Sequence, residues 1–211
     1  MNELNVFISV GGTSTEQQET FVRAVEDRLR IEGITPHTVG RNTFSADAPL
    51  KAISELMNRC TGTVVIALER TYFASGMERR GGSKETTLTD VKLPTPWNHI
   101  EAAMAYTRGL PLMVIVETGI KSEGLLERGY DWYVQWINPE PAALNSAEFN
   151  GVLASWKQKM VNTPRKPSLA RAPSEFTVVE LIGGLKPAQL WSVIVALAAV
   201  VAGAFALGAK L

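Results

Sequence analysis

Short, continuous hydrophobic runs alternate along this chain with segments whose apolar residues recur every three or four positions. A short continuous run is typical of a buried strand, and the longer period is typical of an amphipathic helix. The predicted strands are 5–10, 35–39, 63–68, 112–116 and, as an edge strand, 130–137. Strands that alternate with helices predict an α/β fold, in which a mostly parallel sheet has helices on both faces.

Four segments of the chain show the helical period. They are about 15–32, 50–57, 97–108 and 149–160. The first starts at Thr15, and Gln18 is placed three residues later for a capping box. We expect residues 1–161 to form one domain, because a chain of this length holds one hydrophobic core of ordinary size.

The most apolar run of the chain is 190–209, in which Ser192 is the only polar side chain. As a helix, such a run spans roughly 30 Å, the thickness of the hydrocarbon core of a bilayer. Trp191 and flanking lysines suit the two membrane interfaces. We therefore predict a transmembrane helix at 188–211. A buried helix of a globular domain is the alternative.

Residues 162–187 connect the domain to this predicted helix. Three prolines and four charged residues between 162 and 175 indicate a linker, and 176–182 is a short apolar juxtamembrane segment. More basic residues precede the predicted helix than follow it, so the positive-inside tendency places residues 1–161 in the cytoplasm. We thus expect a single-pass, tail-anchored membrane protein with lipid as a partner.

The charges of the chain balance, with 21 Lys and Arg against 21 Asp and Glu. No overall field favours nucleic acid, and we expect no nucleic-acid partner. The single cysteine, Cys60, excludes an internal disulfide and a zinc site built from cysteines. Two histidines, His37 and His99, are too few and too far apart to indicate a metal site.

Ligands of open parallel sheets bind outside the carboxyl ends of the strands. Gly11-Gly12-Thr13-Ser14 links the first strand to a helix N-terminus, whose free N–H groups and dipole attract phosphate. An ordinary turn explains the two glycines equally well. The loop 41–49 places Arg41 and Asp47 near the same edge, where they either bind a ligand or are simply solvated.

The third predicted helix carries the strongest candidate for chemistry. Trp97 and Glu101 are four residues apart and share a helical face. We expect Ile100, Ala103 and Met104 to form the buried stripe, with Glu101 at its border facing a cleft. A carboxylate beside an aromatic ring can hold a sugar, or stabilise the charge that develops when a glycosidic bond breaks. Alternatively, Glu101 merely complements the helix dipole.

Several short motifs occur in a fixed order: Val6-Phe7-Ile8-Ser9, Val64-Val65-Ile66-Ala67, Tyr72 and Trp97-x-x-x-Glu101. In their order and spacing, residues 5–137 resemble the TIR domain and its flavodoxin-like relatives, the nucleoside 2-deoxyribosyltransferases. The resemblance implies that Glu101 acts on the ribose of NAD or a nucleoside. It also implies that 41–49 is the BB loop, which gates the site and mediates assembly in TIR domains.

The motifs and the resemblance together imply a set of ligand-binding residues, with NAD or a related nucleotide as substrate or ligand and no other cofactor. The set is Ser9, Gly11, Gly12, Thr13, Arg41, Asp47, Tyr72 and Trp97. Two features depart from the family. Ser9 is followed by Val-Gly-Gly, and the stretch before Trp97 is long, with a polar, glycine-rich part at 75–96. This insertion is either a lid over the cleft or the mark of a site rebuilt for sensing.

Three hypotheses follow for the function. The first is a membrane-anchored enzyme that binds NAD or a related nucleotide and cleaves its N-glycosidic bond through Glu101, as the resemblance to antiphage-defence proteins implies. The second is a non-catalytic receptor of a nucleotide messenger, whose clustering disrupts the membrane through the C-terminal helix. The third is an adaptor for protein assembly. We favour the enzyme, and we expect a homo-oligomer.

Overall fold

The computed structural model describes residues 4–163 and Trp191. In this part of the chain, no helix is both long and apolar enough to cross a membrane. The predicted transmembrane helix at 188–211, Trp191 aside, lies outside the described residues, as does nearly all of the predicted linker at 162–187.

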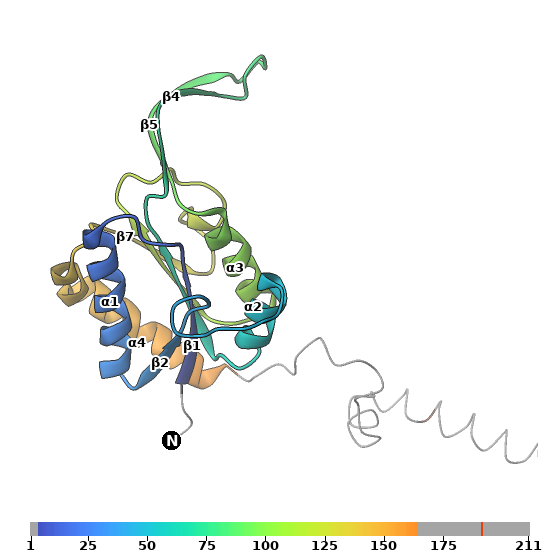
Figure 1. The fold of residues 1–211 in the computed structure, drawn as a ribbon, viewed down its shortest axis with the longest axis vertical. Coiled ribbons are helices and arrows are strands. Elements are labelled where there is room, and N and C mark those ends of the chain that lie inside the picture. Colours follow the sequence, from blue (N-terminus) through green and yellow to red (C-terminus); the bar gives the residue numbers. More distant parts are fainter. Residues whose placement is uncertain (1–3, 164–190, 192–211) are drawn as a thin grey trace, which may run out of the picture. The chain divides into compact units, whose positions relative to one another are not determined.

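The central sheet of the described part has five parallel strands in the order β2-β1-β3-β6-β7 (Figure 1). Their bounds are β1 (Leu4–Val10), β2 (Ile34–His37), β3 (Gly62–Ala67), β6 (Leu112–Glu117) and β7 (Tyr133–Ile137). Numbered among themselves, these strands run 2-1-3-4-5, which is the flavodoxin-like order. The prediction of a parallel α/β sheet is confirmed, and so is the edge position of the last strand.

Helices cover both faces of this sheet (Figure 1). On one face lie α1 (Glu16–Ile31) and α4 (Ala147–Asn162), and on the other lie α2 (Pro49–Met57) and α3 (Pro96–Thr107). Two short 3-10 helices, η1 (Gly124–Leu126) and η2 (Pro141–Asn145), lie in connections. Because successive strand residues point to opposite faces, Val64 and Ile66 pack with α1 and α4, whereas Val65 packs with α2 and α3.

Thr15 caps the start of α1 as the sequence predicts, but the Gln18 side chain binds the backbone of Ser14, whereas a capping box would require that of Thr15. The Thr15 hydroxyl accepts a hydrogen bond from the Gln18 N–H (3.2 Å), and the Gln18 side-chain oxygen accepts one from the Ser14 N–H (2.9 Å). The Gln18 side-chain amide also donates to the Glu69 carbonyl, just after β3 (2.9 Å). The cap therefore ties the start of α1 to the carboxyl end of a neighbouring strand.

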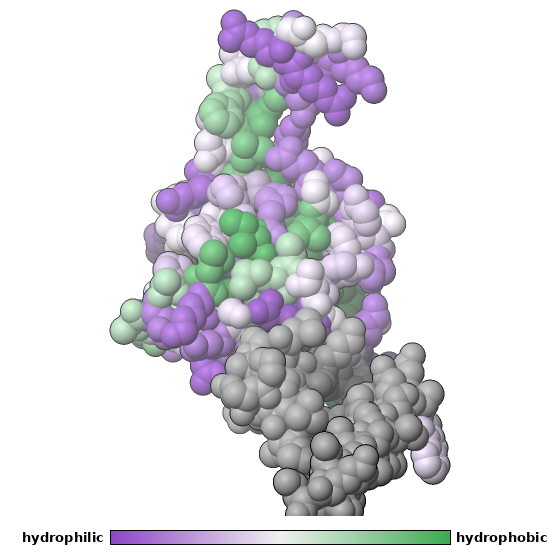
Figure 2. All heavy atoms as spheres, turned by 90° about the vertical axis from the view of Figure 1, so that its right-hand side faces the viewer, coloured by the Kyte–Doolittle hydropathy of each residue, from purple (hydrophilic) through white to green (hydrophobic). Residues whose placement is uncertain are grey.

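An antiparallel hairpin of β4 (Thr71–Glu78) and β5 (Thr86–Leu93) rises from the carboxyl edge of the sheet (Figure 1). The sequence predicts no strand in 75–96, because both faces of the hairpin are largely exposed and neither imposes an apolar alternation. Phe73 and Met77 are each 49% exposed. Figure 2 shows hydrophobic residues along the stem of the hairpin and hydrophilic residues at its tip.

Ion pairs anchor the hairpin to the loops that follow β3 and β6. The Lys92 ammonium lies 2.7 Å from the Glu69 carboxylate. The Lys121 ammonium lies 2.8 Å from Glu78 and 2.9 Å from Glu123. A two-stranded hairpin is only marginally stable by itself, so these contacts help to hold it at the edge of the sheet.

The buried face of α3 differs from the predicted stripe. Ile100 is 43% exposed and Ala103 is exposed, while Met104 is half-buried. The residues that face the sheet are Asn98, Glu101, Ala102 and Ala105. The prediction was wrong because it assumed that the largest apolar side chains turn inward. Small alanines instead let α3 approach the sheet closely, and its two polar residues bury with them.

Candidate active site

The turn after β1 lies close against the start of α3. A Cβ atom on Gly11 would come within 3.0 Å of the Thr95 Cγ2 atom, so the turn or the Thr95 side chain would have to shift to admit a larger residue. The Arg70 guanidinium donates a hydrogen bond to the Gly12 carbonyl (3.2 Å). The ends of β1 and β3 and the start of α3 therefore meet at the carboxyl edge, where ligands of such sheets bind.

A buried polar pair lies at this junction. Ser9 in β1 and Asn98 in α3 are 0% and 1% exposed. The Asn98 side-chain nitrogen donates to the Ser9 hydroxyl (3.0 Å), to the Ser9 carbonyl (3.1 Å) and to the Ile66 carbonyl (3.4 Å). This amide therefore holds the first turn of α3 against the ends of β1 and β3.

Glu101 lies one helical turn beyond Asn98 and is only 8% exposed. Burial raises the pKa of the Glu101 carboxyl to about 7, because an ionised carboxylate is poorly solvated there. A hydrogen bond with the Ser9 hydroxyl acts in the opposite direction and lowers the pKa. At neutral pH the carboxyl is therefore divided between its protonated and ionised forms.

The Ser9 hydroxyl lies between the Asn98 amide and the Glu101 carboxyl and forms a hydrogen bond with each. Its oxygen accepts a hydrogen bond from Asn98 (3.0 Å), which leaves its own hydrogen to be donated to Glu101. A glutamate that only complemented the helix dipole would gain nothing from this burial. A buried carboxyl with a perturbed pKa and an oriented donor is instead typical of a functional site.

Two aromatic residues of the predicted site are more exposed than these three polar residues. Trp97 is 40% exposed in the first turn of α3, where the Thr95 hydroxyl accepts its backbone N–H (3.4 Å). Tyr72 is 49% exposed in β4, and its hydroxyl donates to the Asp90 carboxylate (2.6 Å). Both rings have faces on which a flat base could stack.

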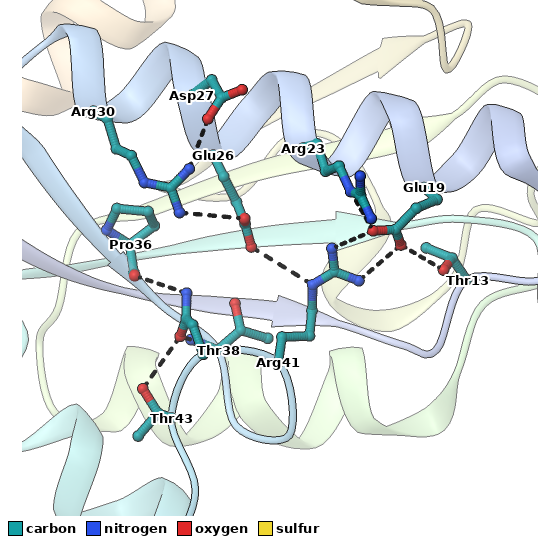
Figure 3. Close-up of polar contacts among 11 residues, drawn as sticks. Thr13, Glu19, Arg23, Glu26, Asp27, Arg30, Pro36, Thr38, Arg41 and Thr43 are labelled. Atoms are coloured by element: carbon teal, nitrogen blue, oxygen red, sulfur yellow. Dashed lines mark hydrogen bonds and ion pairs between the residues drawn. The ribbon is translucent and has the colours of Figure 1, made fainter.

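Thr13 and Arg41 both bind Glu19 of α1, as Figure 3 shows. The Arg41 guanidinium donates to both Glu19 carboxylate oxygens at 2.9 Å, and the Thr13 hydroxyl donates at 2.8 Å. The Arg41 guanidinium also lies 3.6 Å from Glu26. The Arg41 hydrogen bonds, with those from Thr13 and Arg23, lower the pKa of Glu19 to about 2. The structure thus joins the glycine turn to the loop 41–49.

Asp47, the remaining predicted ligand-binding residue, has the contacts of a surface loop. Its carboxylate accepts a hydrogen bond from Ser45 (3.2 Å) and pairs with Lys51 (2.8 Å). The Lys51 hydrogen bond lowers the pKa of Asp47. These bonds hold Asp47 to the start of α2.

Arg41→Ala is expected to lower the free energy of unfolding at pH 7 by about 1–2 kcal/mol, a figure reduced for the partial exposure of the Arg41–Glu19 pair. The folded pKa of Glu19 is depressed, so this stabilisation is present above pH 4.5 and is lost as the pH falls toward about 2. Urea denaturation at pH 7 and pH 3 measures both effects. Lys51→Ala, which removes an exposed pair, serves as the control and should change little.

A small cavity lies between the ends of β1 and β3 and the starts of α1 and α3. Its volume is about 10 Å³, room for one oxygen-sized group. It is lined by Val10, Gly11, Gly12, Gln18, Leu68, Glu69, Arg70, Thr95 and Asn98. Among the residues that the structure describes, no group of three or more His, Cys, Asp or Glu could hold a metal ion.

Sequence reasoning did not single out Asn98 or Glu19. A signal for Asn98 exists in hindsight: it precedes Glu101 by three residues and shares its helical face. Glu19 offers no comparable signal, because an acidic residue in the first turn of a helix is common on solvated surfaces.

No protein-family model and no curated protein matches this chain. Among solved structures, the CMP N-glycosidase BcmB of Clostridium botulinum aligns with 72% of this chain and 98% of its own, at 14% identity and a TM-score of 0.43. The TIR domains of the activated Roq1 resistosome, which recognises the pathogen effector XopQ, align with 75% of this chain and 74% of their own, at 12% identity and a TM-score of 0.35. These likenesses are distant, and the fold of this chain is established by its own strand order.

Proposed function

We propose that this chain cleaves the N-glycosidic bond of NAD or a related nucleotide, with Glu101 as the catalytic carboxyl. The observation that carries the proposal is the burial of Glu101 beside Ser9 at the carboxyl edge, with a pKa of about 7. A carboxylate in such a poorly solvated place interacts strongly with a cation, because little water screens the two charges.

The reaction breaks the bond between C1′ of the ribose and a nitrogen of the base. The base leaves with the bonding electron pair, and positive charge develops on C1′ and the ring oxygen. Ionised Glu101 stabilises this cation. Water then adds its oxygen to C1′ and loses a proton to the solvent, which yields the free base and the phosphorylated sugar, ADP-ribose in the case of NAD. The nicotinamide of NAD is already cationic and leaves neutral, so it needs no proton.

The surroundings of Glu101 suggest how a nucleotide is held. Gly11 and Gly12 precede the N-terminus of α1, whose N–H groups and dipole favour phosphate. The exposed ring of Trp97 is available to stack with the base. Arg41 is neutralised by Glu19 and so contributes little positive charge for phosphate. The cavity of about 10 Å³ admits one group only, and the rest of the nucleotide lies over the edge.

We further propose that residues 1–161 act at the cytoplasmic face of a membrane, as a homo-oligomer in antiphage defence. The support is the apolar run 190–209 and the resemblance of 5–137 to TIR domains. The same features suit a non-catalytic receptor whose clustering disrupts the membrane. The buried, perturbed Glu101 favours the enzyme, because a receptor needs no such carboxyl.

The test is to incubate the purified full-length protein, in detergent and at concentrations that favour self-association, with NAD. Chromatography would follow free nicotinamide over time. Sustained release above the spontaneous rate supports the enzyme. The absence of release from NAD and from a panel of ribonucleoside monophosphates, by protein that binds them, would favour the receptor.

Ser9→Ala is expected to shift the pH dependence of base release to higher pH. The Ser9 hydroxyl stabilises the ionised form of Glu101, so its loss raises the pKa of that carboxyl further. Hydrogen bonds to charged groups are worth about 1.5–3 kcal/mol, which corresponds to a shift of roughly one to two pH units. The rising limb of kcat/KM against pH measures this shift.

Thr63→Val is a matched control for Ser9→Ala. It removes another fully buried strand hydroxyl, at the opposite, amino-terminal end of β3. The pH profile of this variant should equal that of the wild type. An unshifted profile in Ser9→Ala would mean that Ser9 does not act on the group whose ionisation controls the rate.

A further inference from the structure

The orientation of the Asn98 amide is determined by its surroundings. Two of its neighbours, the Ser9 carbonyl (3.1 Å) and the Ile66 carbonyl (3.4 Å), are acceptors only. The side-chain nitrogen must face them, because a flipped amide would place an oxygen against two carbonyl oxygens. The Asn98 Oδ1 atom is therefore the free end of the amide.

This Oδ1 atom is buried and has no hydrogen-bond partner among the residues that the structure describes. Asn98 is 1% exposed, and it lines the cavity of about 10 Å³ beside Gly11 and Gly12. A buried acceptor without a partner is costly, so native proteins rarely retain one without a reason. Because its nitrogen faces the strand ends, Oδ1 is the amide atom available to a group in the cavity.

We propose that Asn98 Oδ1 accepts a hydrogen bond from the 2′-hydroxyl of the ribose whose glycosidic bond is cleaved. This inference rests on the proposed function, in which Glu101 acts at C1′. Asn98 and Glu101 are three residues apart on one face of α3, so their side chains are neighbours. The 2′-hydroxyl is carried by the carbon next to C1′ and reaches Asn98 when C1′ faces Glu101.

The size and polarity of the cavity determine which chemical group can bind to Asn98 Oδ1. A volume of about 10 Å³ holds one oxygen-sized group and excludes a base or a phosphate. The atom to be satisfied is an acceptor, so the entering group must donate, as a hydroxyl does. Asn98 is therefore a specificity-determining residue for ribonucleotides over 2′-deoxyribonucleotides. A ligand without the 2′-hydroxyl leaves the buried oxygen unpaired.

The experiment measures binding rather than turnover, with the full-length Glu101→Gln variant in detergent. Isothermal titration calorimetry compares three ligands: NAD, its analogue that lacks the 2′-hydroxyl on the nicotinamide ribose, and the analogue with fluorine in place of that hydroxyl. Fluorine keeps the size of the group but cannot donate a hydrogen bond. We expect both analogues to bind about 10-fold to 100-fold more weakly than NAD.

A second comparison tests whether Asn98 causes the preference for NAD over its two analogues. In Asn98→Ala, combined with Glu101→Gln, the three ligands should bind with nearly equal affinity, and circular dichroism verifies that this variant folds. Gln135→Ala is the matched control, since Gln135 in β7 is another buried amide whose oxygen has no hydrogen-bond partner in the described part of the chain. The preference for NAD should persist in that control. The ligand comparison with Asn98 intact stands even if Asn98→Ala does not fold.

The outcomes separate this inference from the function on which it rests. Equal affinities for NAD and both analogues would overturn the role of Asn98 and leave cleavage through Glu101 standing. A clear preference for NAD, without base release by the wild type, would overturn the cleavage and leave the role of Asn98 standing. If the folded protein bound neither NAD nor any of the ribonucleoside monophosphates, both proposals would be overturned.

Discussion

Glu101→Gln is expected to lower the rate of base release by a factor of at least about 1000, with nucleotide affinity close to that of the wild type. Glutamine has nearly the size of glutamate and can accept the hydrogen bond from Ser9, but it carries no charge to oppose the ribosyl cation. Chromatography of nicotinamide or another free base gives the rate, and calorimetry gives the affinity.

The control for this prediction is Glu123→Gln. Glu123 lies in the loop after β6, pairs with Lys121 (2.9 Å) and is not among the residues that line the cavity. This variant should release base at a rate near that of the wild type. If Glu101→Gln retained a comparable rate, the assignment of Glu101 as the catalytic carboxyl would be wrong.

The same Glu101→Gln substitution is expected to stabilise the folded protein, by about 3 kcal/mol at pH 8. The folded pKa of Glu101 is about 7, above the ordinary 4.5, so the folded state holds this proton more tightly than the unfolded state. Ionisation then costs the wild type stability progressively between pH 4.5 and pH 7. Glutamine never ionises and avoids this cost. Below pH 4.5 the two proteins should be nearly equal in stability.

Urea denaturation at pH 4 and pH 8 measures the difference for the wild type and the variant. Glu19→Gln supplies a control of opposite sign, because the folded pKa of Glu19 is depressed to about 2 by Arg41 and Thr13. Its loss should destabilise the fold above pH 4.5. A Glu101→Gln variant without a gain at pH 8 would show that the wild-type carboxyl ionises there without cost.

Under the proposed function, a single physical cause makes Glu101 both costly to stability and reactive. Burial withholds water from Glu101, and that makes its ionised form both costly in the resting protein and effective against a cation. Functional residues often lower the stability of the fold, because selection requires only that the fold remain stable enough to function.

The helix α3 shows which features of the site can be predicted from the sequence and which cannot. The spacing of Trp97 and Glu101 predicts that they share a helical face, and the helix begins and ends within a residue of its predicted bounds. The choice of buried face was wrong, since Ile100 lies outside and Asn98 inside. Periodicity locates a stripe of large apolar residues. It does not reveal that small residues and a polar pair can form the closer contact with a sheet.

The hairpin β4–β5 is a second feature that the sequence pattern does not predict. Its attachment to the edge of the sheet uses contacts between residues far apart along the chain, such as Lys121 with Glu78, and both of its faces are largely exposed. Without a buried face, a strand leaves no alternation to detect. The sequence pattern of the polar segment 75–96 therefore does not predict strands, although the structure forms the β4–β5 hairpin there.

By itself, the sequence determined the parallel α/β sheet, the order of its elements and the candidates at its carboxyl edge, because continuous apolar strands and capped amphipathic helices are local patterns. Only the tertiary structure decided the chemistry of those candidates. It turned Arg41 to Glu19, placed Asn98 against the ends of two strands and buried Glu101 beside Ser9. A pKa depends on solvation and on neighbours that are distant in the chain, and these are set only when the elements pack.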